Sequence, residues 1–386
     1  MTTTPSAPAK KKATFNTLTV SEVRALTEDS VEVSFAIPPE LQDDYDYIPG
    51  QYVALRATID GQEVRRSYSI CDVPRDGVLR VAIKRDRGGV FSTWANDTLQ
   101  PGDTMDVMNP QGAFTSKTHL TGLNNPEAVR EELEKLENPH LVAIAAGSGI
   151  TPIMAIAQTV LHSSPDTTFE LIFANKGGGD VMFAEEIGDL KDKFPTRFAV
   201  HHVLSREQRV NPLFSGRIDA EKLQTLLDNV VRTDNVDEWF LCGPFELVQL
   251  VRDELASRNV GEKDVRYELF TTGKPSGDQN QAGHHVEVDP EGDNVTINFQ
   301  LDGLSGSVES PVSANESLLN AALRVRSDVP FACAGGVCGT CRAKLVEGDV
   351  DMAENYALEA DEVKAGYILT CQSRPTTPNI VLDFDA

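Results

Sequence analysis

The stretch CAGGVCGTC, from Cys333 to Cys341, places three of the chain's six cysteines close together, with glycines between them. A fourth cysteine, Cys371, follows in the segment YILTCQSRP. This spacing, C-x4-C-x2-C and a distant cysteine, is the plant-type pattern of [2Fe–2S] ligands. The glycines allow the backbone to lie close to a bound cluster. We therefore predict that Cys333, Cys338, Cys341 and Cys371 bind a [2Fe–2S] cluster.

Two alternatives exist for these cysteines. Zinc also takes four cysteines, but structural zinc sites usually pair two short C-x2–4-C knuckles. Disulfides require an oxidising compartment. The N-terminal stretch MTTTPSAPAKKKATF has no apolar segment behind its basic cluster, so it does not resemble a secretory signal. The sequence contains no run of eighteen apolar residues, so we expect no membrane span. We therefore expect a cytoplasmic protein with reduced thiols, which favours a metal site over disulfides.

The composition sets further limits. The chain has 386 residues, of which 40% are hydrophobic and 24% charged, as expected for a globular protein of two or three domains. Its formal net charge of −24 would repel nucleic acid and an anionic membrane. We therefore expect neither as a partner.

The sequence pattern changes along the chain. Residues 1–15 form an expected disordered tail. Residues 16–118 contain short β-rich runs such as VEVSFAI and YVALRATI, which indicate an antiparallel barrel or sandwich. In residues 140–271, buried-strand runs such as LVAIAAG and FELIFAN alternate with helical patterns, which predicts a parallel sheet covered by helices.

Three further segments complete the predicted organisation. Residues 119–139 are a connecting insertion that contains the helix-favouring PEAVREELEKLENP. Residues 272–285, rich in Gly, Gln, Pro and Ser, are the predicted linker. Residues 286–386 then carry the cysteines. A helix is predicted there at about Asn315–Arg326, with Ser313 and Glu316 at capping-box spacing.

A flavin is expected between NAD(P)H and the cluster. NAD(P)H gives two electrons as a hydride and the cluster takes one, so a flavin is the usual adaptor. The segment RRSYSI contains Arg66, Tyr68 and Ser69 in the order R-x-Y-S, which resembles a motif of the ferredoxin–NADP reductase superfamily. Arginine can neutralise a pyrophosphate, tyrosine can stack on the isoalloxazine ring, and serine can hydrogen-bond near flavin N5.

The segment VAIKRDRGGVFSTW supports the same resemblance. The resemblance places Ile83 and Lys84 along the flavin. It also places Gly89, Val90 and Ser92 at the FAD pyrophosphate, where a glycine-rich turn would expose amides to an anion. Each part alone is also compatible with an ordinary strand or turn.

The segment GSGITP, from Gly147 to Pro152, follows a buried strand and opens a helix, which suits a nucleotide phosphate. It departs from the Rossmann pattern because Pro152 replaces the third glycine. Instead it resembles the G-x-G-x-x-P variant of the reductase superfamily, with Gly147 and Gly149 as its glycines. That resemblance implies that Thr151 lies near the flavin and the nicotinamide.

The later segment LCGP contains Cys242, Gly243 and Pro244 and resembles the C-G-P strand end of the same superfamily. The resemblance implies that Cys242 lies beside nicotinamide C4 and flavin N5. The alternative is a small buried thiol without a role in catalysis.

The adenosine end of the nucleotide is expected after the strand FAVHHVLS. The resemblance places Ser205 and Arg206 at the adenosine ribose, where arginine could pair with the 2′-phosphate of NADPH. Arg217 is a possible helper. Phe270, in YELF, is expected over the other face of the flavin.

The order of the three modules resembles the reductase components of multicomponent oxygenases, and the C-terminal segment ENYALEADEVKAGYILTCQSRP resembles the phenylacetyl-CoA epoxidase reductase family. The resemblance implies an antiparallel FAD-binding β-barrel, an α/β NADP-binding domain with a parallel sheet, and a β-grasp ferredoxin domain. It also implies that Ser69 and Cys242 act in catalysis and that a di-iron oxygenase is the partner. A reductase of a steroid or aromatic-ring hydroxylase shares these motifs, and a zinc-binding scaffold is the non-enzymatic alternative.

Overall fold

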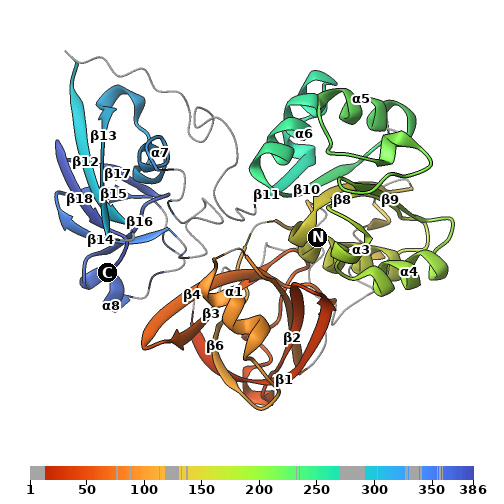
Figure 1. Cartoon of the computed structure of the whole chain (residues 1–386), viewed down its shortest axis with the longest axis horizontal. Coiled ribbons are helices and arrows are strands. Elements are labelled where there is room, and N and C mark those ends of the chain that lie inside the picture. Colours follow the sequence, from red (N-terminus) through yellow and green to blue (C-terminus); the bar gives the residue numbers. More distant parts are fainter. Residues whose placement is uncertain are drawn as a thin grey trace, which may run out of the picture. The chain divides into compact units, whose positions relative to one another are not determined.

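The computed structural model describes most of the chain, and the described residues form two compact units. One unit runs from Phe15 to Leu269 and the other from Gly292 to Ala386. The described positions are 14–74, 77–86, 88–112, 114–117, 130–131, 133–135, 138–231, 233, 235–269, 292–301, 303–326, 329, 339, 341–353, 355, 358 and 360–386. Each unit is described by itself (Figure 1).

The first unit begins with a nearly closed antiparallel barrel in the order β4-β3-β6-β1-β2-β5. Its strands are β1 (Phe15–Thr27), β2 (Ser30–Ala36), β3 (Tyr52–Ile59), β4 (Gln62–Ser69), β5 (Val78–Lys84) and β6 (Thr104–Met108). Ile70, just after β4, forms a bridge with Val81 of β5 and brings the two edges together. The predicted barrel is confirmed, with two strands more than the β-rich runs indicated.

Helix α1 (Val90–Asp97) lies within the barrel segment, where the sequence pattern does not indicate a helix. Its eight residues are too few for a clear periodicity. The helix instead depends on tertiary packing, because Phe91 and Ala95 are buried in the barrel core. Figure 1 shows the helix over the barrel.

The second part of this unit is a parallel five-stranded sheet in the order β11-β10-β7-β8-β9, as predicted. The strands are β7 (His140–Ala146), β8 (Thr168–Asn175), β9 (Phe198–Leu204), β10 (Glu238–Gly243) and β11 (Val265–Leu269). The helices are α3 (Ile150–Ser163), α4 (Ala184–Lys193), α5 (Ala220–Asn229) and α6 (Phe245–Ser257).

Both faces of this parallel sheet are covered. Leu171 of β8 belongs to the same buried cluster as α3 and α4, whereas its neighbour Ile172 packs with α5 and α6. Successive residues of a strand point to opposite faces, so the two helix pairs lie on opposite sides of the sheet. Because the five strands are parallel, their carboxyl ends meet at one edge of the sheet. The predicted nucleotide-binding residues lie at or just after these strand ends.

The C-terminal unit contains a mixed sheet in the order β13-β12-β18-β14-β16 and a small two-stranded sheet, β15-β17. The strands are β12 (Asn294–Leu301), β13 (Leu304–Pro311), β14 (Arg342–Glu347), β15 (Val350–Met352), β16 (Tyr367–Leu369), β17 (Ser373–Pro375) and β18 (Asn379–Asp383). A short α8 (Ala360–Lys364) precedes β16. Buried residues of α7 (Leu318–Leu323) pack against the mixed sheet, as expected for a β-grasp domain.

The predicted start of α7 is wrong. Ser317, not Ser313, caps the helix, because its Oγ accepts a hydrogen bond from the Asn320 N–H at 3.3 Å. Glu316 instead accepts from Ser310 at 2.8 Å and pairs with Arg324 at 2.6 Å. The side chain of Glu316 is therefore engaged in tertiary contacts. Among the described residues, no helix is both long and apolar enough to cross a membrane.

Candidate functional site

Tyr68 and Ser69 end strand β4 at the side of the barrel that faces the parallel sheet. The Tyr68 ring packs against the barrel core, 5.7 Å from the Phe91 ring between centroids. Burial raises the pKa of Tyr68 well above its ordinary value, so the phenol stays neutral. Ser69 is buried. The strand therefore presents a fixed aromatic ring and a hydroxyl next to each other.

Ser69 makes a contact between the two halves of this unit. Its Oγ donates a hydrogen bond to Oε2 of Glu268 in β11 at 3.1 Å. Glu268 is paired in register with Cys242 on β10. Residues paired in register in a parallel sheet point to the same face, so the hydroxyl, the carboxylate and the thiol converge.

Cys242 is fully buried in this cluster. Burial, together with the negative charge of Glu268, raises the pKa of its thiol well above the ordinary value. A neutral thiol is a poor nucleophile, so Cys242 is suited to packing against a ligand rather than to covalent chemistry. The Ser69–Glu268 pair, in contrast, can hold or move a proton.

Glu268 was not identified from the sequence. The segment YELF drew attention only to Phe270, which lies outside the described residues. The available signal was a carboxylate near the end of a predicted strand, close to a predicted cofactor site, because a buried carboxylate needs a polar partner. Its partner, Ser69, lies 199 positions earlier in the chain, so no local pattern could identify the pair.

The glycine turn after β7 lies against the end of β10. A Cβ on Gly149 would stand 2.2 Å from the carbonyl oxygen of Cys242, which only glycine avoids. Gly147 has a φ of +54°, which favours glycine. A Cβ at Gly147 would meet no atom within 4 Å, so the space beside this residue is open. Thr151 is buried and donates to the Ser148 carbonyl at 3.0 Å. The two predicted nucleotide motifs are therefore brought together.

The strand end of β10 leads directly into the next helix. Gly243 closes β10, and Pro244 occupies the position before the first residue of α6. A Cβ on Gly243 would stand 3.1 Å from the Cβ of Ala146 at the end of β7. The close approach of these two strand ends places the C-G-P segment beside the glycine turn.

The two β5 residues expected along the flavin, Ile83 and Lys84, differ in how far their side chains can reach a ligand. The Ile83 side chain is buried in the barrel core, so only its backbone could touch a ligand. Lys84 forms an ion pair with Asp29 of the β1–β2 turn at 2.7 Å. Burial raises the pKa of Asp29, but hydrogen bonds from Lys84 and Thr27 outweigh it and leave the pKa lowered. The Lys84 ammonium is therefore held by Asp29, and only 15% of its side chain is exposed.

The predicted pyrophosphate residues lie at the start of α1. Gly89 precedes Val90, the first residue of the helix. Ser92 accepts a hydrogen bond from the Asp86 N–H at 3.0 Å and so holds the preceding loop. Arg66 on β4 is exposed, and its positive charge acts on Asp86. An arginine and the start of a helix therefore lie near the same loop, which suits a phosphate group.

The predicted adenosine residues follow β9. The Ser205 N–H donates to the Asn175 carbonyl at 2.9 Å, and the Arg206 N–H donates to the Lys176 carbonyl at 2.7 Å. Arg206 is exposed, as is Arg217, whose preceding glycine donates to the end of β9. Both guanidinium groups are therefore available beside one strand end.

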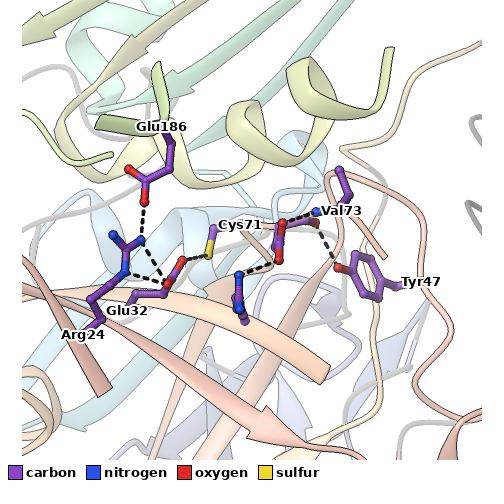
Figure 2. A network of polar contacts seen from close by, with 8 residues as sticks. Arg24, Glu32, Tyr47, Cys71, Val73 and Glu186 are labelled. Carbon is purple, nitrogen blue, oxygen red and sulfur yellow. Dashed lines mark hydrogen bonds and ion pairs between the residues drawn. The ribbon is translucent and has the colours of Figure 1, made fainter. Parts of the chain in front are cut away.

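A second contact joins the barrel to the α/β part (Figure 2). Arg24 of β1 donates to Glu32 of β2 at 3.1 Å and also to Glu186 of α4. Glu32 is largely buried, and its other oxygen accepts from the Cys71 thiol at 3.8 Å. One guanidinium group therefore links strands β1 and β2 of the barrel to α4 of the α/β part, which also carries Cys242.

Two of the four predicted cluster ligands lie in the described part of the C-terminal unit. Cys341 and Cys371 are buried. Thr370 donates from its N–H and from Oγ1 to the Cys341 carbonyl, at 3.1 and 2.9 Å. Gln372 Nε2 lies 3.7 Å from the Cys371 sulfur. Cysteines on adjacent segments, with a donor near one sulfur, fit a thiolate-ligated cluster.

The other two predicted ligands, Cys333 and Cys338, lie outside the described residues.

Three family models match this chain and together cover most of it. Residues 17–116 match the oxidoreductase FAD-binding domain, residues 143–253 the oxidoreductase NAD-binding domain, and residues 301–376 the 2Fe-2S iron-sulfur cluster binding domain. Each match falls on the part of the chain where the sequence predicts that cofactor.

Whole-chain relatives agree with this order of domains. A subunit of the 1,2-phenylacetyl-CoA epoxidase of Escherichia coli is 40% identical over 97% of this chain and 98% of its own length. The 3-ketosteroid-9-alpha-monooxygenase ferredoxin reductase component of Rhodococcus rhodochrous is 32% identical over 95% and 96%.

A solved structure, phthalate dioxygenase reductase, shares the fold with a TM-score of 0.52 at 21% identity, over 96% of this chain and 98% of that one. The chain therefore belongs to the ferredoxin–NADP reductase-like family of oxidoreductases with FAD-binding, NAD-binding and 2Fe-2S domains, which includes the epoxidase component of Escherichia coli.

Proposed function

We propose that this protein passes electrons from NADPH through FAD and a [2Fe–2S] cluster to a di-iron oxygenase, the phenylacetyl-CoA 1,2-epoxidase of phenylacetate degradation. The observation that carries the proposal is the 40% identity to a component of that epoxidase along nearly the whole of both chains. The convergence of Ser69, Glu268 and Cys242 between the FAD-binding and NAD-binding parts supports the hydride-transfer step.

The barrel residues would hold the FAD. Tyr68 would stack on the flavin ring, and Arg66 with the start of α1 at Gly89 would neutralise its pyrophosphate. Bound FAD supplies the chemistry that accepts a hydride and releases single electrons. Ser69 can accept a hydrogen bond from a donor in the site while its own O–H donates to Glu268, or it can donate to the site when its O–H turns away from Glu268.

The α/β residues would hold the nicotinamide nucleotide. Thr151 and Cys242 would pack around the nicotinamide, and the neutral thiol would exclude water without reacting. Ser205 and Arg206, with Arg217 as a helper, would bind the 2′-phosphate of NADPH. Arg206→Ala should therefore raise the KM for NADPH far more than the KM for NADH. Equal effects on the two coenzymes would remove Arg206 from 2′-phosphate recognition.

The cluster would be held by Cys333, Cys338, Cys341 and Cys371 and would pass single electrons outward. An iron–sulfur protein of this kind is coloured, whereas a zinc-binding scaffold would be colourless. The visible spectrum of the purified protein, with its content of iron and acid-labile sulfide, separates these two candidates.

The partner is tested by mixing the reductase with purified oxygenases. We expect NADPH consumption that depends on phenylacetyl-CoA when the epoxidase oxygenase is present. A 3-ketosteroid 9α-monooxygenase oxygenase is the second candidate, because a reductase component of that system is 32% identical over 95% of this chain. Faster substrate-dependent turnover with the steroid oxygenase than with the epoxidase would replace the first assignment by the second.

A further inference from the structure

Asn175, the last residue of β8, carries a buried carboxamide without a partner. Only 8% of the residue is exposed, and neither Oδ1 nor Nδ2 has a hydrogen-bond partner among the residues that the structure describes. A buried amide that leaves both groups unpaired is costly, and such groups normally find a partner. The partner of Asn175 must therefore come from outside these residues.

The strand register shows which way this side chain points. Cys242 is paired with Ala145 of β7, and Ala145 is paired with Phe173 of β8, so these three residues form one row on one face of the sheet. Asn175 is two positions beyond Phe173 and therefore lies on the same face, one step further toward the carboxyl edge. It is level with Gly147, where the glycine turn begins.

Asn175 also lies between the two ends of the predicted nucleotide site. Adjacent strands are about 4.8 Å apart, so β8 lies roughly 10 Å from β10, which carries Cys242. On the other side, the Asn175 carbonyl accepts the N–H of Ser205, next to Arg206. A dinucleotide with its nicotinamide at Cys242 and its 2′-phosphate at Arg206 must pass the carboxamide.

We propose that the Asn175 carboxamide binds a ribose hydroxyl of the nicotinamide dinucleotide, an inference that depends on the proposed function. A hydroxyl group both donates and accepts, so it can pair with Oδ1 and with Nδ2. A phosphate oxygen only accepts, so it would satisfy Nδ2 and leave Oδ1 without a partner. Because both atoms of Asn175 are unpaired, a ribose hydroxyl fits them better.

The test compares Asn175→Leu, which keeps the volume and removes both polar groups, with Asn175→Asp, which keeps the Oδ1 acceptor and replaces the Nδ2 donor by a second acceptor. The dissociation constant of NADP⁺ is measured from the flavin difference spectrum. We expect Asn175→Leu to weaken binding by at least about tenfold, because one lost hydrogen bond can account for about tenfold and this change removes two. Asn175→Asp should weaken it less, because a carboxylate still accepts from a hydroxyl.

Thr167→Val is the matched control. Thr167 directly precedes β8 at its other end, is fully buried, and its hydroxyl has no partner in the described part of the chain. Its removal should leave the dissociation constant of NADP⁺ unchanged. Without nucleotide, Asn175→Leu should melt at the same temperature as the wild type or higher, because an unpaired amide has been removed.

Unchanged NADP⁺ binding by Asn175→Leu would overturn the proposal. Weaker binding by Asn175→Asp than by Asn175→Leu would also overturn it, because a new negative charge is worst beside a phosphate. Loss of FAD from Asn175→Leu during purification would also overturn it and would assign the carboxamide to the flavin instead. If Asn175→Leu does not fold, Asn175→Ala, which also removes both polar groups, takes its place in these comparisons. Failure of the wild type to bind NADP⁺ would instead contradict the proposed function.

Discussion

Ser69 and Glu268 form a single polar unit between the FAD-binding and NAD-binding parts. The hydroxyl donates to the carboxylate at 3.1 Å, and the carboxylate lies beside the buried Cys242 thiol. Groups that share one hydrogen bond act together, so their effects on a rate are not additive. The unit is therefore best tested by comparing single and double substitutions.

Glu268→Gln should slow the reduction of the flavin by NADPH roughly 100-fold, at the lower end of the contribution of a positioned proton-transfer group. Ser69→Ala should have a similar effect, and the double variant should be no slower than the worse single variant. Stopped-flow absorbance of the flavin measures all three rates. Glu246→Gln, at an exposed carboxylate in the first turn of α6, is the control. Multiplicative losses would show that the two residues act separately.

Glu32 should make stability depend on pH. Burial raises its pKa above the ordinary 4.5, although the nearby Arg24 charge acts to lower it. A group with a raised folded-state pKa contributes stability at pH below its unfolded pKa and loses it as pH rises through the folded pKa. As pH rises from 4.5, the wild type should therefore lose free energy of unfolding relative to Glu32→Gln. Urea midpoints over this range measure the difference, and a constant difference would contradict the assignment.

At the scale of elements, β1, β2 and α4 are joined by Arg24. Arg24→Ala would remove the guanidinium from the largely buried Glu32 and break the contact to Glu186. Leaving such a carboxylate without its partner should lower the free energy of unfolding by about 1–3 kcal/mol. It should also slow NADPH-dependent flavin reduction, because the contact holds the barrel against α4.

The control for this contact is Arg85→Ala. This change removes an exposed ion pair with Asp97, and both residues belong to the barrel part. It should leave the urea midpoint and the rate of flavin reduction nearly unchanged. The triple variant Arg24→Glu, Glu186→Arg and Glu32→Gln exchanges the two charges of the contact and removes the charge of Glu32, which would otherwise face the new glutamate. It should restore part of the rate of flavin reduction. A rate of flavin reduction that is unaffected in Arg24→Ala would show that the contact has only a structural role.

Long, strongly patterned elements could be predicted from the sequence, whereas features that depend on tertiary contacts could not. The strand VEVSFAI and the parallel strands LVAIAAG and FELIFAN are found within a residue or two of their predicted bounds. Helix α1 was missed because its eight residues depend on Phe91 packing into the barrel. The start of α7 was misplaced because Glu316 pairs with Ser310 and Arg324, contacts that no capping pattern contains.

The candidate site follows the same rule. The motifs identified Ser69, Gly149 and Cys242 because each stands in a recognisable local pattern. Glu268 and Asn175 have no such pattern, and only the pairing of distant strands brings them to the same edge. The sequence motifs therefore indicate which cofactors the chain binds, whereas the strand topology decides which further residues lie at the same site.

At the scale of the whole molecule, the FAD-binding and NAD-binding parts form one compact unit and the ferredoxin domain forms another. Cys338→Ala should therefore remove the visible absorbance of the cluster and the transfer of electrons to the oxygenase. It should leave the reduction of an artificial two-electron acceptor by NADPH intact, because that reaction needs only the first unit. Loss of this activity in a folded, flavin-loaded variant would contradict the modular arrangement.

The central claim is that electron pairs from NADPH leave the protein singly through a [2Fe–2S] cluster. Its most direct test is an anaerobic titration of the purified protein with NADPH, followed by visible absorbance and electron paramagnetic resonance. We predict bleaching of both flavin and cluster absorbance, the appearance of a reduced-cluster resonance, and about two irons and two sulfides per chain. Flavin bleaching without a resonance, in protein that contains neither iron nor acid-labile sulfide, would contradict the account.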